Sequence, residues 1–467
     1  MSTRPLRLCT ALTGGLLLAG IATANPFETT LDNGLKVIVK EDTRAPSAVH
    51  MVWYRAGAMD EPEGVSGIAH MLEHMMFKGT ETVGPGEFNQ RVAARGGRDN
   101  AFTSRDYTAY FQQIPPQYLG EMMALEADRM SHLKIDDALF RPEVEVVKEE
   151  RRLRIEDQPM SLLAETAMAT AYQSHPYRHP VIGWMDDIQH YTLQDALDWY
   201  QSWYTPANAI VVVVGDVKHE EVFAAAREHY GAIPVRALPE RRDITEAPQR
   251  GQRTASVEAP ADMPYLWLSW RAPTLREVGG DRDVYALQML ASVLGGYDGA
   301  RLPRRLVRER RLATYADASF DGVGRGPAMF SLGGAPAAGV SVADLEAALL
   351  AEIADIQQNG IGEDELARVR TQATAQHVYK RDSLMGQAME IGSLEASGYT
   401  WRDDETMLEQ FRSVTAAEVR AAAQKYFTPA SQTRAELIPQ KLAAAPAADA
   451  SQQPAPLDAA GSEATVH

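Results

Sequence analysis

The chain has 467 residues, of which 45% are hydrophobic and 23% charged, so its length and composition predict a globular protein of two to four domains. Its net charge of −17 argues against nucleic acid or an anionic membrane surface as the main partner, because both repel a strongly acidic protein. The same charge is compatible with positively charged peptides as ligands, although it does not require them.

The first 24 residues have the three parts of a secretory signal peptide. Two arginines precede an apolar run, Leu8–Ala22, and Ala22-Thr23-Ala24 then provides a small-x-small cleavage site. We therefore expect a cleaved signal over residues 1–24 and a periplasmic mature chain, with an uncleaved membrane anchor as the less favoured alternative. The single cysteine lies inside this segment, so the mature chain would lack thiol chemistry. No later stretch is long and apolar enough to span a membrane, so we expect no integral membrane segment after processing.

Strands and a helix are predicted next along the chain. Residues 28–56 predict a pair of strands, Leu35–Val39 and Val49–Tyr54, and Asn33-Gly34 indicates a tight turn. Residues 66–79 then predict a helix. Ser66 can cap its N-terminus, and Gly79 can end it in a left-handed conformation.

Two histidines lie four residues apart in this helix, so their side chains project from the same face. His70 and His74 can therefore bind one metal ion. Glu73 lies beside them, where a carboxylate can accept a proton from a water molecule on the metal. The pattern His-x-x-Glu-His is the inverted form of a common zinc motif. The alternative is a chance pair of surface histidines, since the chain contains 11 of them.

Residues 142–156 predict a further helix that carries two glutamates on one face. Pro142 suits the first helical position, and Glu143 and Glu150 lie two turns apart on the same side. The residues alone favour a solvated helix with ion pairs between neighbouring turns. Between the two helices, strands are predicted over 100–104 and 107–111.

The second half of the chain repeats the first. Thr192-Leu-Gln-Asp195 and the later Tyr204-Thr205-Pro206-Ala207 have counterparts 223 residues on, in Thr415-Ala-Ala-Glu418 and Phe427-Thr428-Pro429-Ala430. A duplicated α+β unit of about 200 residues explains this repeat. An apolar strand, such as Ala209–Val214, follows each Thr-Pro-Ala turn.

The repeat and the composition divide the chain. We expect domains over residues 25–235 and 263–440, a linker over 236–262 that is rich in Pro, Arg and Glu, and a disordered tail over 441–467. The position equivalent to the histidine helix, Tyr285–Leu294, contains no metal ligands, so the two copies must have different roles.

His70–Thr80 resembles the zinc helix of the M16 metallopeptidases, and Gly96–Tyr110 is similar to the strand region that follows it in that family. The resemblance covers about residues 28–435. It implies Zn²⁺, one ion per chain, bound by His70, His74 and Glu150, with Glu73 as the general base. Glu150 is the second glutamate in Val146-Val147-Lys148-Glu149-Glu150, and Glu143 matches a further family glutamate that supports the site. This implication replaces the solvated-helix interpretation.

The second half also resembles this family. Arg308 and Tyr315, seven residues apart, are similar to a pair that reaches across from the half without zinc and holds the substrate carbonyl near the metal. One departure affects this pair. The family usually has Gly-Leu-x-Tyr before the strand, whereas this chain has Arg311-Leu312-Ala313-Thr314-Tyr315, so the glycine is missing.

The resemblance implies an α+β clamshell, in which each half is an antiparallel sheet flanked by helices. In this size class two chains usually combine, so we expect a homodimer or a heterodimer with a related partner. The implied activity is that of a zinc metalloendopeptidase.

We expect a peptide substrate to add as a strand to a sheet edge near Asn100, Ala101 and Thr103, which would favour short or unfolded peptides. One alternative is a non-catalytic or partner-dependent subunit. Another is a periplasmic protein that binds peptides with zinc and does not cut them, but such a protein would not need Glu73.

Overall fold

Strand β3 (Ala48–Tyr54) is buried along its whole length, because helices cover both faces of its sheet. Within residues 26–440, which the computed structural model describes, six strands form this sheet in the order β1-β2-β6-β3-β5-β4. Among them only the β2–β6 pair is parallel. The other strands are β1 (Phe27–Thr30), β2 (Lys36–Glu41), β4 (Arg98–Thr103), β5 (Thr108–Ile114) and β6 (Ala209–Gly215).

The predicted pairing of the first strands is wrong. The Asn33-Gly34 turn joins β1 to β2, and β6 lies between β2 and β3. All seven residues of β6 are buried, so this apolar strand occupies the centre of the sheet, where both faces are covered.

Helices cover one face of this sheet with a large apolar core. They are α1 (Ile68–Met75), α2 (Glu87–Ala94), α3 (Leu119–His132), α7 (Leu193–Trp203) and α8 (His219–Tyr230), with α4 (Asp137–Arg151) and α6 (Met185–His190) outside them. Edge strand β4 contacts both α1 and α2.

The second sheet repeats the arrangement of the first. In the described part of the chain its order is β7-β11-β8-β10-β9, again with one parallel pair, β7–β11. Its strands are β7 (Arg253–Pro260), β8 (Tyr265–Ala272), β9 (Ala313–Phe320), β10 (Ala328–Pro336) and β11 (Gln432–Gln440). Its helices are α9 (Arg282–Leu294), α10 (Val342–Asn359), α11 (Glu363–Lys380), α13 (Asp403–Arg412) and α14 (Ala416–Tyr426). Strand β7 lies inside the predicted linker, which is therefore shorter than expected.

The predicted repeat is visible in the local structure. Thr192 and Thr415 each cap a helix through a capping box, with Asp195 and Glu418 as the respective partners. In each half the helix leads through a Thr-Pro-Ala turn into a strand near the centre of the sheet. Helix α9 packs against α14 as α1 packs against α7.

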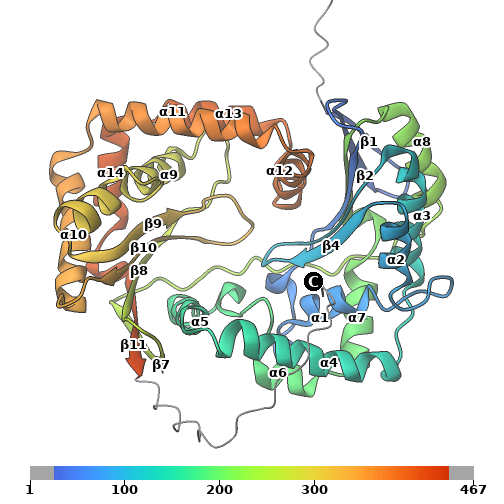
Figure 1. Ribbon diagram of the computed structural model, residues 1–467, viewed down its shortest axis with the longest axis horizontal. Coiled ribbons are helices and arrows are strands. Elements are labelled where there is room, and N and C mark those ends of the chain that lie inside the picture. The colour runs from blue at the N-terminus through green and yellow to red at the C-terminus, as the bar shows by residue number, and fades with distance from the viewer. Residues whose placement is uncertain (1–25, 441–467) are drawn as a thin grey trace, which may run out of the picture.

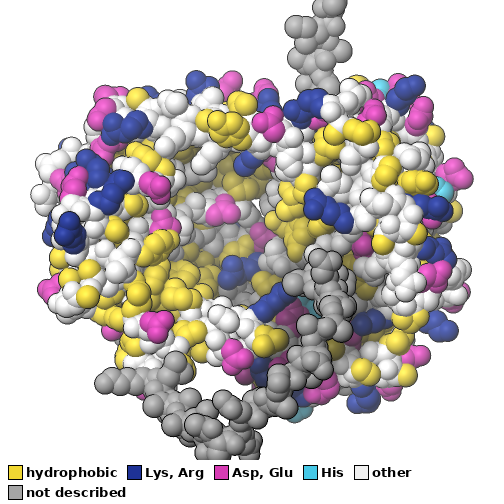
Figure 2. Space-filling model, in the orientation of Figure 1, with side chains coloured by type: hydrophobic (Ala, Val, Ile, Leu, Met, Phe, Trp, Pro, Cys, Tyr) yellow, Lys and Arg dark blue, Asp and Glu magenta, His cyan; other side chains and the backbone are white. Residues whose placement is uncertain are grey.

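Each half gives one helix to the sheet of the other (Figure 1). Helix α12 (Leu384–Ala396) belongs to the second half but packs on the free face of the first sheet, and α5 (Pro159–Ala171) packs on β7 and β11 of the second. At Gly392 of α12, an added Cβ would lie 2.0 Å from the Trp53 ring, so only glycine lets this helix approach β3 so closely. The exchange ties the two lobes together as a clamshell around a hollow (Figure 2).

A loop of the second half also docks into the first. Arg325, between β9 and β10, donates two hydrogen bonds of 2.7 Å to the carboxylate of Asp60, and its backbone N–H donates to Asp106. Tyr177 donates to the other oxygen of Asp106 and accepts from the backbone of Gly326. The Asp60 side chain is only 4% exposed, so the Arg325 guanidinium replaces the solvent that would otherwise stabilise a carboxylate there.

The predicted signal peptide and the predicted tail lie outside the described residues. Within residues 26–440, none of the helices combines the length and apolar character that a bilayer crossing needs.

We expect Arg325→Ala to lower the free energy of unfolding by roughly 2–3 kcal/mol, because it leaves the buried Asp60 carboxylate with Arg241 as its remaining cation. Denaturant titration measures this change. Arg91→Ala, which breaks an exposed ion pair with Glu87, is the matched control and should change stability little. Equal effects of the two substitutions would contradict a role for Arg325 in joining the lobes.

Candidate metal centre and active site

Helix α1 carries the two histidines on a short, buried segment. Its apolar residues pack on the first sheet, and His70 is itself only 9% exposed. The helix begins differently from the prediction. Gly67, at φ 87°, is the N-cap, whereas Ser66 bonds to Asp187.

A buried carboxylate holds the N-terminus of α1. Glu61 accepts hydrogen bonds from the backbone N–H groups of Gly67 and Ala69, at 2.7 and 3.0 Å. Burial raises the pKa of Glu61 to about 8. The two backbone N–H donors act in the opposite direction and lower this pKa, because they stabilise the ionised carboxylate. These bonds fix the end of the helix beside His70. The other end also differs from the prediction, since α1 stops at Met75, before the left-handed Gly79.

Helix α4 brings the two glutamates to α1. It begins at Asp137, earlier than predicted, because the Asp136 side chain caps it by accepting from the backbone N–H of Leu139. Pro142 therefore lies inside the helix and not at its first position. The predicted common face of Glu143 and Glu150 is present, and both side chains point at the α1 histidines.

Three candidate ligand atoms converge between α1 and α4. Glu150 Oε2 lies 3.1 Å from His74 Nε2 and 3.8 Å from His70 Nε2, and one donor atom from each residue lies within 4.8 Å of the others. On its other side His74 donates from Nδ1 to Glu143 Oε1 at 2.9 Å. That bond leaves His74 Nε2 facing Glu150. Lys78 pairs with the second oxygen of Glu143.

This donor set fits a zinc ion. Ligands at zinc bond lengths stand about 3.3 Å apart in a tetrahedron, close to the separations from Glu150 Oε2 to the two histidines. The same Glu150 oxygen is buried and has no aligned hydrogen-bond partner among the described residues. Two imidazoles and one carboxylate are also the ligand types of catalytic zinc sites that keep an open position. The Glu143–His74 contact is the carboxylate–histidine arrangement that orients metal ligands.

The protein environment shifts the pKa values of these groups in opposite directions. Burial lowers the pKa of His70 to about 4. At His74 burial also lowers the pKa, but the carboxylates of Glu143 and Glu150 outweigh it and raise the value to about 9. Burial raises the pKa of Glu73. A raised pKa makes the Glu73 carboxylate a stronger base towards a nearby water molecule.

Glu73 points from α1 towards the edge of the first sheet. It accepts a hydrogen bond from the Thr103 hydroxyl at the end of β4. Strand β4 pairs with β5 on one side, and no other described strand pairs with its free edge. Ala101 packs towards α1, whereas the exposed Asn100 holds the N–H of Ala101 through its own side chain. The structure therefore brings Glu73 beside the predicted strand edge.

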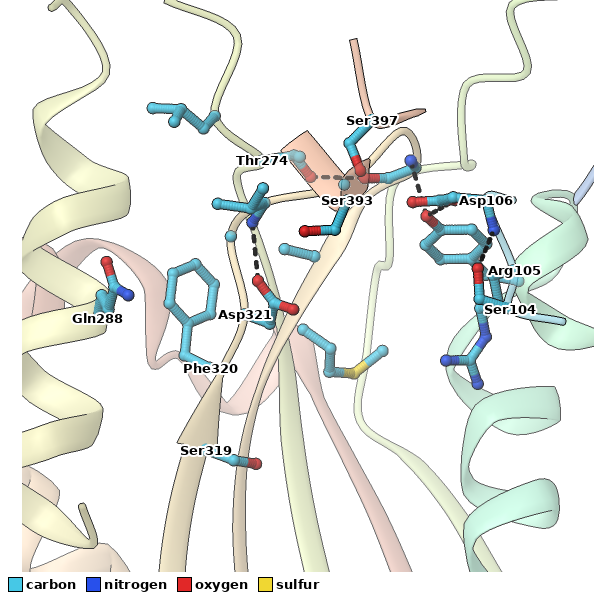
Figure 3. Close-up of a pocket in the computed structure, with 18 of the residues that line it drawn as sticks. Ser104, Arg105, Asp106, Thr274, Gln288, Ser319, Phe320, Asp321, Ser393 and Ser397 are labelled. Atoms are coloured by element: carbon cyan, nitrogen blue, oxygen red, sulfur yellow. Dashed lines mark hydrogen bonds between the residues drawn. The ribbon is translucent and has the colours of Figure 1, made fainter. Parts of the chain in front are cut away.

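A cavity of about 1120 Å³ opens between the lobes just beyond β4. Its wall includes Ser104, Arg105 and Asp106 from the first half and Phe320 and Asp321 from the second (Figure 3). None of these residues was a predicted site residue, although Ser104, Arg105 and Asp106 lie within the Gly96–Tyr110 motif. Only the meeting of the two halves brings this segment close to Phe320 and Asp321.

The second predicted pair is not part of this cluster. Arg308 lies on a π-helical turn, Pro303–Glu309, and donates to the backbone oxygen of Asp298. Tyr315 lies on edge strand β9, is 51% exposed, and stacks on Tyr265. Neither residue makes a hydrogen bond or ion pair with the α1 or α4 site residues in the described chain, and neither lines the cavity.

The turn between Arg308 and Tyr315 contains a residue in the left-handed conformation. Arg311 has φ 52° and is the one non-glycine residue in the described chain with a positive φ. Glycine adopts this left-handed conformation easily, whereas the Cβ of an arginine makes it unfavourable. The turn between Arg308 and Tyr315 is formed at a cost in backbone energy.

Comparison with known families gives two matches that together span most of the chain. Residues 36–183 match the family described as Insulinase (Peptidase family M16), and residues 190–373 match the Peptidase M16 inactive domain. The chain is 31% identical to the zinc protease PqqE of Helicobacter pylori over 419 residues, which cover 88% of this chain and 92% of that protein. It is 29% identical to an uncharacterized zinc protease of Mycobacterium tuberculosis over 85% of this chain and 90% of that protein.

Solved structures show the same architecture. A protease from Helicobacter pylori superposes with a TM-score of 0.84 at 30% identity, over 89% of this chain and 100% of that one. A putative M16-like peptidase from Alicyclobacillus acidocaldarius gives 0.79 at 20% identity, over 89% of this chain and 98% of that one, which shows the shared fold.

Glu143→Gln should weaken Zn²⁺ binding by about tenfold or more, because the neutral amide orients and polarises His74 less well than the carboxylate. Competition with a chelator of known affinity measures the change. Glu145→Gln is the control on the same helix, since Glu145 is exposed and bonds only to Lys148 among the described residues. An unchanged affinity in Glu143→Gln would contradict its orienting role.

Arg311→Gly should raise the free energy of unfolding by about 1 kcal/mol, because glycine adopts the left-handed conformation without a Cβ clash. The same change at Arg310, whose φ is −89°, should instead lower stability, since there glycine only adds freedom to the unfolded chain. Thermal denaturation of the two variants compares them directly. A loss of stability in Arg311→Gly would count against strain at this turn.

Proposed function

This chain belongs to the M16 peptidase family, and we propose that it is a zinc-dependent endopeptidase that hydrolyses short or unfolded peptides. One observation carries the proposal. Glu73 lies between the cluster of His70, His74 and Glu150 and the free edge of β4. If a peptide added to that edge, one of its peptide bonds would lie beside both the candidate base and the candidate metal ligands. The proposed zinc-binding domain spans residues 25–235, and its homologous partner domain spans 263–440.

His70, His74 and Glu150 would hold the ion, and Glu143 would orient His74. When bound, Zn²⁺ supplies a Lewis acid that polarises a carbonyl group and lowers the pKa of a water ligand towards about 7. Glu73 takes the proton of the attacking water and later returns it to the leaving amine. The Thr103 hydroxyl supports this exchange by holding one Glu73 oxygen in place.

Substrate recognition would use the main chain of β4. A peptide that adds as a strand bonds to backbone N–H and C=O groups, so extended shape matters more than particular side chains. Asn100 and Ala101 would line the bound strand, and Thr103 would lie nearest the reacting bond. The clamshell and its cavity limit access to short or unfolded chains.

A partner chain would complete the site. Arg308 and Tyr315 are exposed and do not meet the zinc ligands of their own chain. This supports a homodimer, or a heterodimer with a related M16 protein, in which each second half faces the zinc half of the other chain. The phenol of Tyr315 and the guanidinium of Arg308 would then bind the substrate carbonyl. The location we propose is the periplasm, and the solved neighbours include a periplasmic protease of Escherichia coli.

A non-catalytic or partner-dependent subunit is the second candidate. It is favoured by the separation of Arg308 and Tyr315 from the ligands in this chain, and residues 190–373 match a domain described as inactive. The filled set of Glu73, His70, His74 and Glu150 favours catalysis.

Glu73→Gln should abolish cleavage while Zn²⁺ still binds, because the amide accepts no proton. Purified protein with one Zn²⁺ per chain is incubated with an unstructured peptide mixture, and mass spectrometry identifies the products. Glu149→Gln is the control, since Glu149 is exposed and pairs with Arg152 on the same helix as Glu150. Cleavage by Glu73→Gln at the wild-type rate would overturn the mechanism. If the zinc-loaded wild type cuts nothing, the partner-dependent alternative holds.

A further inference from the structure

A second group of metal-ligand side chains lies in the other half of the molecule. His377 at the end of α11, Glu390 on α12 and Asp404 on α13 each offer one donor atom, and these atoms lie within 4.8 Å of one another. The three residues come from separate helices, so the fold brings them together and no sequence motif does. They also line the cavity between the lobes.

The three side chains are largely withdrawn from solvent but poorly paired. His377, Glu390 and Asp404 have side chains that are 12%, 15% and 23% exposed. His377 Nε2 and Asp404 Oδ2 are 3.7 Å apart, which is too long for a hydrogen bond. Their donor atoms therefore lie close together without a direct hydrogen bond between His377 and Asp404.

Few cations directly contact the two carboxylates. Lys380 Nζ is 3.5 Å from Glu390, and it is the one lysine or arginine within 4 Å of the three side chains among the described residues. Arg381 pairs with Glu405, at 3.0 Å. A divalent cation could bind the two carboxylates and the imidazole at once and balance the two negative charges.

We propose that His377, Glu390 and Asp404 bind a second divalent cation, of the zinc or manganese class. One imidazole and two carboxylates suit these ions better than Ca²⁺, which prefers six to eight oxygen ligands. The cation joins α11 and α13 to α12. Because α12 covers the first sheet, it also joins the helical layer of the second lobe to the first lobe.

A further cluster of two glutamates and a histidine has similar spacing but differs in its hydrogen bonding. Glu41, His219 and Glu220 also place donor atoms within 4.8 Å. However, Glu41 already accepts hydrogen bonds from the backbone and the ring of His219, and the Glu220 side chain is 73% exposed. Its donors are satisfied without an ion, so we expect no tight binding there.

The test is a count of bound metal in the full chain. Protein is stripped with a chelator, loaded with Zn²⁺, passed over a desalting column and analysed for zinc by elemental analysis. We expect two zinc ions per chain in the wild type and one in His377→Gln and Asp404→Asn. Glu220→Gln, the matched control, should keep two. Circular dichroism of the metal-free proteins checks that each variant is folded.

The His70→Gln variant separates this proposal from the proposed catalytic zinc. It should keep one ion, and that ion should disappear when His377→Gln is added. Retention of wild-type zinc content in His377→Gln, or a zinc content of zero in His70→Gln, would overturn the second site. As an independent readout, Zn²⁺ should raise the melting temperature of His70→Gln and no longer do so in the double variant. Equal shifts in both would also contradict the site.

Discussion

The packing of α1 against the first sheet is the contact on which the chemistry of this molecule depends. Ile68, Met71, Leu72 and Met75 are buried in that contact, and they fix the rotation of the helix about its axis. His70, Glu73 and His74 must then point the other way, towards α4 and β4. Glu61 binds the start of the helix, which fixes the position of the helix along its own axis in addition to its rotation. Preorganisation of this kind is what a metal centre requires of its ligands.

The two halves are held in register by exchanged elements. Helix α12 covers the first sheet, α5 covers the second, and Arg325 binds Asp60 across the junction. Each of these contacts buries groups from both lobes, so the width of the cavity is set by packing and not by a flexible linker. The walls of the cavity come from both halves for the same reason.

Local patterns in the sequence predicted which candidate site residues share a helix face, but only the family resemblance made Glu143 and Glu150 part of the candidate site. His70, Glu73 and His74 follow from a spacing of four within one helix, and the shared face of Glu143 and Glu150 follows from a spacing of seven. The position of β6 between β2 and β3 depends on pairing over more than 150 residues, which no local pattern encodes. The sequence did not predict the starts of α1, at Ile68, and α4, at Asp137, because Gly67 caps α1 without a side chain and Asp136 caps α4 well before Pro142. The exchange of α5 and α12 depends on tertiary packing, and so do the cavity residues.

The different roles of the two copies follow from the side chains at the uncovered positions of the equivalent helices. Helix α1 is packed on the sheet and on α7, but its remaining face meets the polar side chains of α4 and the open edge of β4. Helix α9 has α11, α13 and α14 against it, and nine of its thirteen residues are buried. Six of the eight α1 residues are buried as well, so the difference lies in the uncovered positions. In α1 they carry Glu73 and His74, whereas in α9 Gln288 and Ser292 line the cavity, and neither is a usual zinc ligand. The second copy therefore has the same fold without metal ligands, and Arg308 and Tyr315 lie exposed on its surface.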